Sequence, residues 1–292
     1  MIRRLAIIGV GLIGGSLALA LRRARAVEEI VGAGRGRANL ELARDCGIVD
    51  RYTTDLSAAV AGAEMVVIGA SLGASEAILT AIAPHLAPDT VVTDVGSTKT
   101  SVVAAARRAL GTRIANFIPG HPIAGTEHSG AAAAFAELYD GHKVILTPLA
   151  ETDPSAHARV RAMWTAAGAS VVDMPVELHD TVLAATSHLP HLLAYGLVDT
   201  LAAHAAADQI FAHAAGGFRD LTRVASSNPR MWTEIALANK AALLEISRAY
   251  MARLDTLVQA LERDDAAFLE AVFTRAKAAR DSCVVPESNR RE

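Results

Sequence analysis

The hydrophobic pattern changes once along the chain, and the change divides it into two parts. Over residues 3–173, short apolar runs rich in Val and Ile alternate with stretches of helical periodicity. The runs predict strands at residues 4–9, 30–33, 65–68, 90–95, 114–118, 143–147 and 170–174. Because most runs carry few charges, they are typical of strands buried on both faces. Alternating strands and helices of this kind predict a doubly wound, mostly parallel α/β sheet.

After residue 174 the strand pattern ends. From about residue 177 to residue 280, Ala, Leu and charged residues recur at helical spacing, which predicts an all-helical second part. Long helices are expected at 179–204 and 229–262, and the second span could hold two helices. Pro190 lies inside the first span and is expected to kink the helix or to cap a turn. We therefore expect domains at 1–174 and 175–283, followed by a disordered tail at 284–292.

The composition is that of a globular protein with room for two cores. The chain has 292 residues, 52% of them hydrophobic, and a net charge of −3 with both signs scattered along it. No basic block favours a nucleic-acid partner, and no apolar run is long enough to span a membrane. The two cysteines, Cys46 and Cys283, lack the spacing of a metal site. Since no signal peptide is visible, we expect a cytoplasmic protein without a membrane or nucleic-acid partner.

A glycine-rich motif joins the first predicted strand to the first predicted helix. The segment GVGLIG at residues 9–14 follows an apolar strand and opens a helix at 12–25, which is the context of a dinucleotide-binding Rossmann turn. Gly9 permits the tight turn, Gly11 lets the backbone approach the pyrophosphate, and Gly14 lets the helix pack on the strand. The helix N-terminus offers free N–H groups to the phosphates. The residues expected to bind the cofactor here are Gly9, Gly11, Leu12, Ile13 and Gly14.

The end of the second predicted strand bears on the choice between NAD and NADP. NAD-binding sites place an Asp or Glu there to hold the ribose 2′-hydroxyl. Gly34 occupies that position in this chain, and Arg35 and Arg37 follow it. A Gly makes room for a 2′-phosphate and an Arg can pair with it, which favours NADP. Arg35 could instead stack on the adenine, in which case NAD would still bind.

Two further segments follow predicted strands, at the edge where ligands bind in open parallel sheets. They are DVGSTK at 94–99, which contains Ser97, and GHPIAGTE at 120–127, which contains His121. His121 stands on a predicted loop and is a candidate general base, because an imidazole titrates near neutral pH. Ser97 could hydrogen-bond that ring and fix its tautomer. His121 could alternatively do no more than close a turn.

The helical part adds a second group of candidates. Ser187 and His191 are four residues apart and share a helix face, with His188 about 100° round from Ser187. The two histidines could indicate a metal, but no carboxylate or thiol stands at a matching spacing, so no metal is expected. They could equally have a plain core or surface role. Asp220 and Arg223 are spaced for an exposed salt bridge, or for offering a guanidinium to a substrate carboxylate.

Taken together and in this order, these motifs resemble the prephenate/arogenate dehydrogenase family of tyrosine biosynthesis. The resemblance covers nearly the whole chain and rests on GVGLIGGS at 9–16, DVGSTK at 94–99, GHPIAGTE at 120–127, SHLPH at 187–191 and GFRDLTR at 217–223. It implies a Rossmann domain followed by a helical domain that forms a homodimer. It also implies hydride transfer to NAD or NADP with oxidative decarboxylation of a small-molecule substrate. That substrate is prephenate, giving 4-hydroxyphenylpyruvate, or L-arogenate, giving L-tyrosine, and the sequence does not choose between them.

The resemblance also implies a role for each candidate residue. His121 accepts the proton of the substrate C4 hydroxyl, Ser97 orients His121, and Arg223 binds a substrate carboxylate. Asp220 is expected to pair with Arg223 or to gate access to the pocket. The remaining substrate-pocket residues are Thr126, Glu127, Ser187, His188, His191 and Trp232. The cofactor residues are Gly9, Gly11, Leu12, Ile13, Gly14, Arg35, Ala70, Ser71, Leu72 and Ser97.

Two other functions stay open at this point. Another two-domain Rossmann dehydrogenase, of the 3-hydroxyacid type, usually uses a lysine of the helical domain as acid and base, and no lysine stands out in that place. A non-catalytic dinucleotide sensor would need the phosphate-binding loop but not His121, Ser187 and Arg223 together. Reduction of the cofactor in the presence of prephenate would distinguish the enzyme from the sensor.

Overall fold

The computed structural model describes residues 1–126 and 128–283 of the chain. These residues pack into two compact units, Met1–Leu243 and a second unit that begins at Leu244. The first unit holds every strand of the described chain, and the second consists of helix. The domain boundary expected at residue 174 lies inside the first unit and stays a prediction. The tail expected at 284–292 lies outside the described residues.

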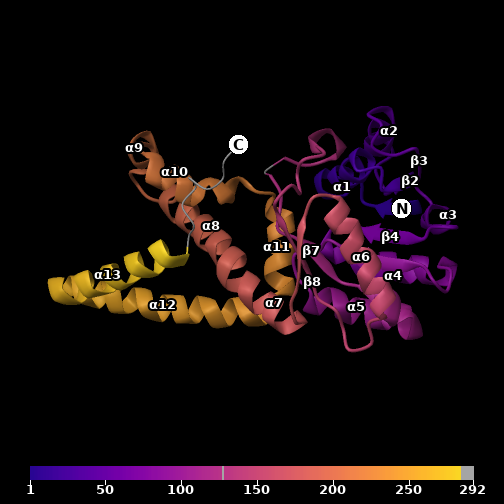
Figure 1. The fold of residues 1–292 in the computed structure, drawn as a ribbon. Helices are drawn as coiled ribbons and strands as arrows, with labels where there is room; N and C mark the ends of the chain where they lie inside the picture. The colour runs from indigo at the N-terminus through magenta and orange to yellow at the C-terminus, as the bar shows by residue number, and fades with distance from the viewer. Residues whose placement is uncertain (127, 284–292) are drawn as a thin grey trace. The chain divides into compact units, whose positions relative to one another are not determined.

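Six parallel strands form the main sheet of the first unit. They are β1 (Ile2–Ile8), β2 (Val27–Ala33), β3 (Arg51–Thr53), β4 (Met65–Ile68), β5 (Val91–Asp94) and β6 (Phe117–Ile118). The strand order is β3-β2-β1-β4-β5-β6, so the direction of sheet growth reverses between β1 and β4. Figure 1 labels β3, β2 and β4 of this sheet, which follow one another in that order. Ile8 at the end of β1 pairs with Ala33 and Ile68, which brings the carboxyl ends of these strands level. Open α/β sheets bind their ligands at this edge, beside the reversal.

Three more strands form a separate mixed sheet. β7 (Gly120–Pro122) pairs antiparallel with β8 (Lys143–Leu146), and β8 pairs parallel with β9 (Ser170–Asp173). The strands predicted at 143–147 and 170–174 are therefore present, but they do not extend the main sheet. The strand predicted at 114–118 is reduced to β6, because a 3₁₀ helix occupies Gly111–Asn116. β3 and β7 were not predicted, since three residues are too few to show an alternating pattern.

Helices cover both faces of the main sheet, because alternate residues of a strand point to opposite faces. Leu5 and Ile7 of β1 join one core cluster, whereas Ala6 and Ile8 join the other. The helices of the first cluster are α1 (Leu12–Arg23), α2 (Arg37–Asp45) and α6 (Pro154–Ala166). Those of the second are α3 (Leu56–Val60), α4 (Ser75–Ile82) and α5 (Thr100–Leu110). The doubly wound α/β arrangement that the pattern predicted is confirmed.

After β9 the described chain contains no strand, as the sequence predicted. The helices of this part of the first unit are α7 (Val176–Leu183), α8 (Leu189–Ala202), α9 (Ala207–Ala212), α10 (Gly216–Thr222) and α11 (Pro229–Ala238). A π-helical turn at Ala184–His188 joins α7 to α8, and Pro190, which has no N–H to donate, stands in the first turn of α8. Of the two outcomes expected at Pro190, a kink or a cap, the structure shows Pro190 at the start of a helix. The π turn precedes it, and π turns of this kind are frequent at functional sites.

The second unit is formed by α12 (Lys240–Glu262) from Leu244 onward and by α13 (Ala266–Cys283). The helical span predicted at 229–262 is thus two helices, α11 and α12, separated at Asn239. Large apolar side chains recur on α12 at helical spacing and are exposed; they are Met251, Leu254, Val258 and Leu261.

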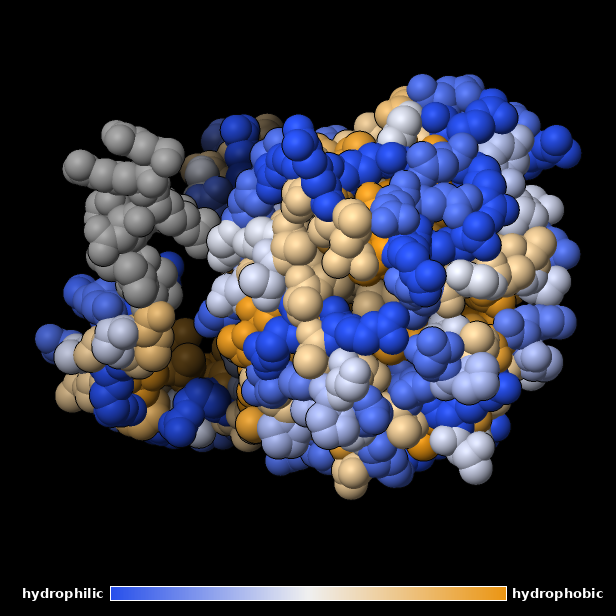
Figure 2. Space-filling model, turned by 45° about the vertical axis from the view of Figure 1, so that its right-hand side comes forward, coloured by the Kyte–Doolittle hydropathy of each residue, from blue (hydrophilic) through white to orange (hydrophobic). Residues whose placement is uncertain are grey.

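The surface is mixed in character on the face that Figure 2 presents, where hydrophilic and hydrophobic side chains lie side by side. Exposed ion pairs such as Arg23–Asp140 and Arg108–Glu76 contribute little to stability, because water screens them. The two core clusters therefore carry the fold of the first unit. Of the helices that the structure describes, none is both long and apolar enough to cross a membrane.

Candidate functional site

The glycine loop between β1 and α1 has the geometry that its sequence predicts. Gly9 has a φ of +98°, and a Cβ there would lie 2.5 Å from the backbone of Gly69, which follows β4. A Cβ on Gly14 would lie 2.6 Å from the carbonyl oxygen of Gly9, so α1 can approach this closely only with a glycine. No atom lies within 4 Å of a Cβ built on Gly11, which leaves that side of the loop open to a ligand.

Unsatisfied N–H groups at the start of α1 face the same loop. No side chain caps the helix, and its first turn carries no acidic residue. Such a terminus attracts phosphate through its free N–H groups and its positive dipole. Asn39 of α2 steadies the loop, because its Nδ2 donates to the carbonyl of Val10 at 2.7 Å and its Oδ1 accepts the N–H of Ala131 at 3.0 Å. The residues present fit the diphosphate of a dinucleotide.

Two arginines follow β2 at this edge, and they differ in their partners. β2 ends at Ala33, and Gly34 comes next, without a carboxylate. Arg35 is exposed and makes no hydrogen bond or ion pair with another described residue. Arg37, the first residue of α2, pairs with Glu41 at 3.1 Å. Arg35 is therefore the arginine whose guanidinium is available to a ligand.

The segment after β4 connects the sheet edge to the helical part of the unit. Ala70, Ser71 and Leu72, the residues predicted to contact the cofactor, follow β4 and are partly or fully exposed. The N–H of Gly73, the next residue, donates to Glu234 of α11 at 3.2 Å. The predicted cofactor segment is thereby held against α11.

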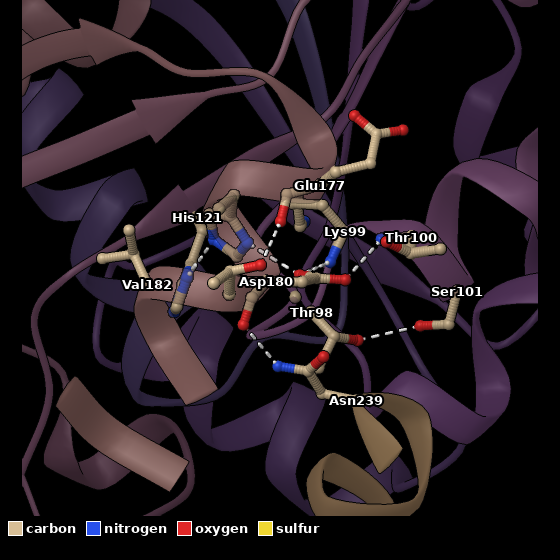
Figure 3. A network of polar contacts seen from close by, with 12 residues as sticks. Thr98, Lys99, Thr100, Ser101, His121, Glu177, Asp180, Val182 and Asn239 are labelled. Carbon is tan, nitrogen blue, oxygen red and sulfur yellow. Dashed lines mark hydrogen bonds and ion pairs between the residues drawn. The ribbon is translucent and has the colours of Figure 1, made fainter. Parts of the chain in front are cut away.

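A buried lysine joins the end of β5 to the start of β7 (Figure 3). Lys99 is completely buried, and its Nζ donates to Asp94 Oδ2 at 2.5 Å and to the carbonyl of Gly120 at 2.6 Å. Asp94 also accepts the N–H groups of Gly96 at 2.7 Å and of Gly120 at 3.1 Å. Burial lowers the pKa of Lys99, and the charge of Asp94 opposes that shift. This Lys99 clamp (Lys99, Asp94 and Gly120) fixes the position of His121, which follows Gly120 in the sequence.

His121 lies on β7 and not on a loop, which corrects the sequence prediction. Its backbone pairs with Ile145 of β8, on a strand too short to be recognised between a Gly and a Pro. The His121 ring is 9% exposed, and its Nδ1 lies 2.9 Å from Nε2 of His179 on α7. The hydrogen bond expected from Ser97 to His121 is not formed, because His179 occupies Nδ1 and Ser97 bonds to no described residue.

His179 is bonded in turn to Asp180, the next residue of α7. His179 Nδ1 lies 2.8 Å from Asp180 Oδ1, and the Asp180 oxygens also accept the backbone N–H groups of Lys99 at 2.8 Å and Thr100 at 2.9 Å (Figure 3). Burial raises the pKa of Asp180, but the hydrogen bonds from His179, Lys99 and Thr100 outweigh burial and lower the pKa to about 2. Asp180 is therefore a carboxylate at neutral pH. Since a carboxylate can only accept, the proton of His179 sits on Nδ1.

The surroundings keep His121 neutral. Burial lowers its pKa well below the ordinary value of 6.5, and the positive charge of Lys99 lowers the pKa further, whereas Asp180 raises it. No described residue forms a hydrogen bond with Nε2 of His121. A neutral imidazole with one free ring nitrogen is suited to accept a proton.

His188 lies buried on the π turn, close to the same network. Asn239 donates from Nδ2 to His188 Nδ1 at 3.1 Å and to the backbone carbonyl of Asp180 at 2.7 Å. Because Nδ1 of His188 accepts, the proton of the neutral ring is on Nε2, which can donate. Burial lowers the pKa of His188 to about 4, so the ring is uncharged at neutral pH.

His191 and Trp232 form a stacked pair. The two ring centroids are 3.4 Å apart with an interplanar angle of 19°, and His191 Nδ1 donates to the carbonyl of Ser187 at 2.9 Å. His188 meets the edge of the same indole at 6.1 Å. The indole Nε1 of Trp232 is buried without a hydrogen-bond partner among the described residues. His188, His191 and Trp232, which were predicted to line the substrate pocket, therefore lie together in the structure.

The residues predicted to bind the substrate carboxylate and to close the pocket make few contacts with other described residues. Arg223 and Asp220 are both exposed, and the ion pair expected between them is not formed. Two charges in water gain little by pairing, so each stays solvated. Thr126 is exposed, and its Oγ1 accepts the N–H of His128 at 3.2 Å. Glu127 lies outside the described residues.

Several residues of the network were not singled out from the sequence. They are Asp94, Lys99, His179, Asp180 and Asn239. The first two belong to the motif at 94–99, and His179 and Asp180 are adjacent at the start of the helical part, so both pairs offered a signal. Asn239 offered none. No group of His, Cys, Asp or Glu within the described ranges is arranged to hold a metal ion.

Two family models match the chain over most of its length. Residues 17–173 match the nucleotide-binding domain of prephenate dehydrogenase, and residues 175–275 match the dimerization domain of prephenate dehydrogenase. The matched ranges cover the described strands from β2 to β9 and most of the helical part, and they begin after β1 and the glycine loop.

Individual relatives agree with the family models. The chain is 37% identical to cyclohexadienyl dehydrogenase of Zymomonas mobilis over 280 residues, which cover 95% of each chain. Its structure matches a prephenate dehydrogenase from A. aeolicus, solved in complex with hydroxyphenyl propionate and NAD+, with a TM-score of 0.91, 34% identity and coverage of 97% of this chain and 99% of that one. Synechocystis arogenate dehydrogenase matches with a TM-score of 0.82, 31% identity and coverage of 96% and 100%. The chain therefore belongs to the prephenate dehydrogenase family.

Proposed function

We propose that this protein catalyses the NAD(P)-dependent oxidative decarboxylation of prephenate, L-arogenate or both. The observation that carries the proposal is the state of His121: a buried, neutral imidazole whose Nδ1 is occupied by His179 and whose Nε2 is free. His121 follows β6 on the side of the sheet where the glycine loop lies, so a base and a dinucleotide-binding loop share one edge. Family membership supports the same reaction.

The cofactor would be held by groups that the chain leaves open. Gly9, Gly11 and Gly14 shape a loop against which a diphosphate fits, and the first N–H groups of α1 would bind its oxygens. Ala70, Ser71 and Leu72 would contact the cofactor from the end of β4. When bound, the nicotinamide supplies the hydride acceptor for the reaction.

The reaction balances without a metal or a further oxidant. Hydride leaves C4 of the cyclohexadienyl ring, and Nε2 of His121 takes the proton of the C4 hydroxyl in the transition state. The bond between C1 and its carboxylate breaks, its electron pair enters the ring, and CO₂ departs as the ring becomes aromatic. His121 then returns the proton to the phenol oxygen. Acceptance of this proton stabilises the developing positive charge at C4.

Substrate recognition is assigned to the helical part. Arg223 is exposed and free of ion pairs with described residues, so its guanidinium can bind a carboxylate in bidentate geometry. His188 can donate from Nε2 and His191 can accept at Nε2, since the Nδ1 atom of each ring is occupied. Trp232 offers an aromatic face beside them.

Replacement of His121 should abolish most of the activity without affecting the cofactor. His121→Asn removes the proton acceptor, so kcat should fall by about 10²- to 10⁴-fold while the Kd for NAD(P)H stays unchanged. In the wild type, protonation of the base removes activity, and the lowered pKa should place the acid limb of kcat/KM below pH 6.5. Steady-state rates at 340 nm and fluorescence titration of NAD(P)H measure the two quantities. An unchanged kcat would remove His121 from the mechanism, and absence of turnover with both substrates would refute the proposed reaction.

Arg223 should act mainly in substrate binding. Arg223→Ala should raise the KM for prephenate by about 10- to 100-fold with a smaller effect on kcat, because a charge-assisted contact to the carboxylate is lost. Arg219→Ala is the matched control, since Arg219 is an exposed arginine of α10 without an ion pair to a described residue. Equal KM values in the two variants would assign Arg223 to the solvated surface.

We propose NADP as the preferred cofactor, because Gly34 leaves room for a 2′-phosphate and Arg35 is unpaired. Arg35→Ala should lower kcat/KM for NADP by about tenfold or more and leave kcat/KM for NAD nearly unchanged. Arg37→Ala serves as the control, since Arg37 is already paired with Glu41. A wild-type preference for NAD, or an equal effect of both variants on NADP, would contradict this assignment.

We also propose that the chain forms a homodimer through its helical part, with residues 1–174 as the cofactor domain and 175–283 as the substrate and dimerisation domain. The exposed apolar row Met251, Leu254, Val258 and Leu261 supports this, as does the dimerization domain that the family model describes.

Sedimentation equilibrium at micromolar concentration should therefore give twice the 30.5 kDa of one chain. Leu254→Glu places a charge in the apolar row and should shift the equilibrium towards the monomer. Gln259→Glu adds the same charge at an exposed polar position of α12 and should not. A monomeric wild type would refute the proposal.

A further inference from the structure

Three buried side chains form a line of hydrogen bonds that ends at the proposed base. His121 Nδ1 lies 2.9 Å from His179 Nε2, and His179 Nδ1 lies 2.8 Å from Asp180 Oδ1. The His121 and His179 rings are 5.1 Å apart, at an interplanar angle of 62°. His179 is 0% exposed, so its ring nitrogens have no access to water as alternative partners.

The direction of these hydrogen bonds follows from the carboxylate at one end. Asp180 accepts, so His179 carries a proton on Nδ1, which leaves the lone pair at Nε2 to face His121. That lone pair accepts from His121, whose proton is thereby placed on Nδ1. The tautomer of His121 with a free lone pair at Nε2 is the one that can take a proton from a substrate.

We propose that His179 is a positioning residue for His121: anchored by Asp180, it holds the His121 proton on Nδ1 and directs Nε2 to the substrate. The inference deepens the proposed function and rests on it. When Nε2 of His121 takes the substrate proton, the imidazolium keeps its Nδ1 hydrogen bond to His179. The carboxylate of Asp180 then stabilises the positive charge through the His179 ring, as an orienting Asp does in Ser-His-Asp sites.

The anchor at Asp180 is held from three directions. The backbone N–H groups of Lys99 and Thr100 at the start of α5 bind its carboxylate, and Asn239, between α11 and α12, binds its carbonyl oxygen (Figure 3). The Asp180 side chain therefore cannot rotate away from His179 without losing both backbone N–H groups at the start of α5, and the bond from Asn239 holds the Asp180 backbone. If residue 179 only filled space, the fold would have no need to hold the carboxylate of Asp180 in this position.

The charges around His121, His179 and Asp180 are compatible with a positioning role for His179. Two charged side chains act on His121: the ammonium of Lys99 lowers its pKa, and the carboxylate of Asp180 raises it. His179 and His188 would lower the His121 pKa only in their protonated forms. Asp94 neutralises Lys99 through the clamp described above. Asp180 is thus the group that favours the charged form of His121 during catalysis, and it acts through His179.

Two substitutions of His179 separate its two hydrogen bonds. His179→Gln keeps an acceptor near the position of Nε2, and so keeps the contact to His121, but loses the contact to Asp180. His179→Asn keeps a donor near the position of Nδ1, facing Asp180, but cannot reach His121. Both replace a buried imidazole by a smaller amide, so their melting temperatures should fall by similar amounts.

The proposal makes the two variants differ in kcat. His179→Gln should keep kcat within about tenfold of the wild type, whereas His179→Asn should lose about 100-fold or more, by analogy with loss of the orienting Asp in Ser-His-Asp enzymes. KM for the substrate and Kd for NAD(P)H should not change in either variant. If His179→Asn is as active as His179→Gln, or if both losses follow the fall in melting temperature, the positioning role is refuted.

A second measurement does not depend on turnover. Nitrogen-15 NMR of the imidazoles, with His121→Asn used to assign the signals, reports which nitrogen of His121 carries the proton. The wild type should show a protonated Nδ1 and an unprotonated Nε2, and His179→Asn should show a mixture. The opposite tautomer in the wild type would overturn the inference even if the reaction is correct. The predicted tautomer without turnover of prephenate or L-arogenate would refute the proposed function and leave the hydrogen-bonded line in place.

Discussion

The site depends on one buried charge, the ammonium of Lys99. An ion in the interior is costly unless its charge is neutralised and its donors are satisfied. Asp94 supplies the charge and Gly120 a carbonyl, and Asp94 is itself bonded to the N–H groups of Gly96 and Gly120. These contacts tie the end of β5 to the start of β7, so the charge of Lys99 can be buried only when the two sheets meet at this point. Removal of Lys99 or Asp94 would leave the other charge buried and unpaired. The pair therefore holds the end of β5 and the start of β7 in fixed positions.

The same residue also joins the helical part to the sheet. The backbone N–H of Lys99 binds Asp180 of α7 while its side chain holds Gly120, and His121 and His179 meet between these two contacts. The proposed base, His121, and its partner His179 thus come from different elements, β7 and α7, and one lysine brings them within hydrogen-bond distance. Lys99 ends the short turn between β5 and α5, which also includes Ser97. From there its backbone N–H reaches Asp180 and its side chain reaches Gly120.

The sequence predicted those features whose cause is local. The roles of Gly9 and Gly14 follow from a short motif and agree with the space around them, and the alternation of strands and helices predicted the two-faced core. β7 was missed because a three-residue strand that begins with Gly and ends with Pro looks like a turn. The contact between His121 and His179 spans 58 residues, and no periodicity encodes such a distance. The motifs made Ser97 the candidate hydrogen-bond partner of His121, but in the structure His179 is bonded to Nδ1 of His121.

His121 and His188 are kept uncharged, and this matters for binding an anionic substrate. Prephenate is a dianion, and a nearby dianion favours the protonated form of any imidazole, which would disable a base. Burial works in the opposite direction, lowering the pKa of His121 well below 6.5 and that of His188 to about 4. The starting pKa can therefore rise when the substrate binds and still leave His121 able to accept a proton. Lys99 is neutralised by Asp94, so its charge is not offered to the substrate, and the carboxylate recognition that we propose for Arg223 lies outside the buried network. In the proposed mechanism, separation of the binding charge from the neutral base lets one site attract an anion and still abstract a proton from it.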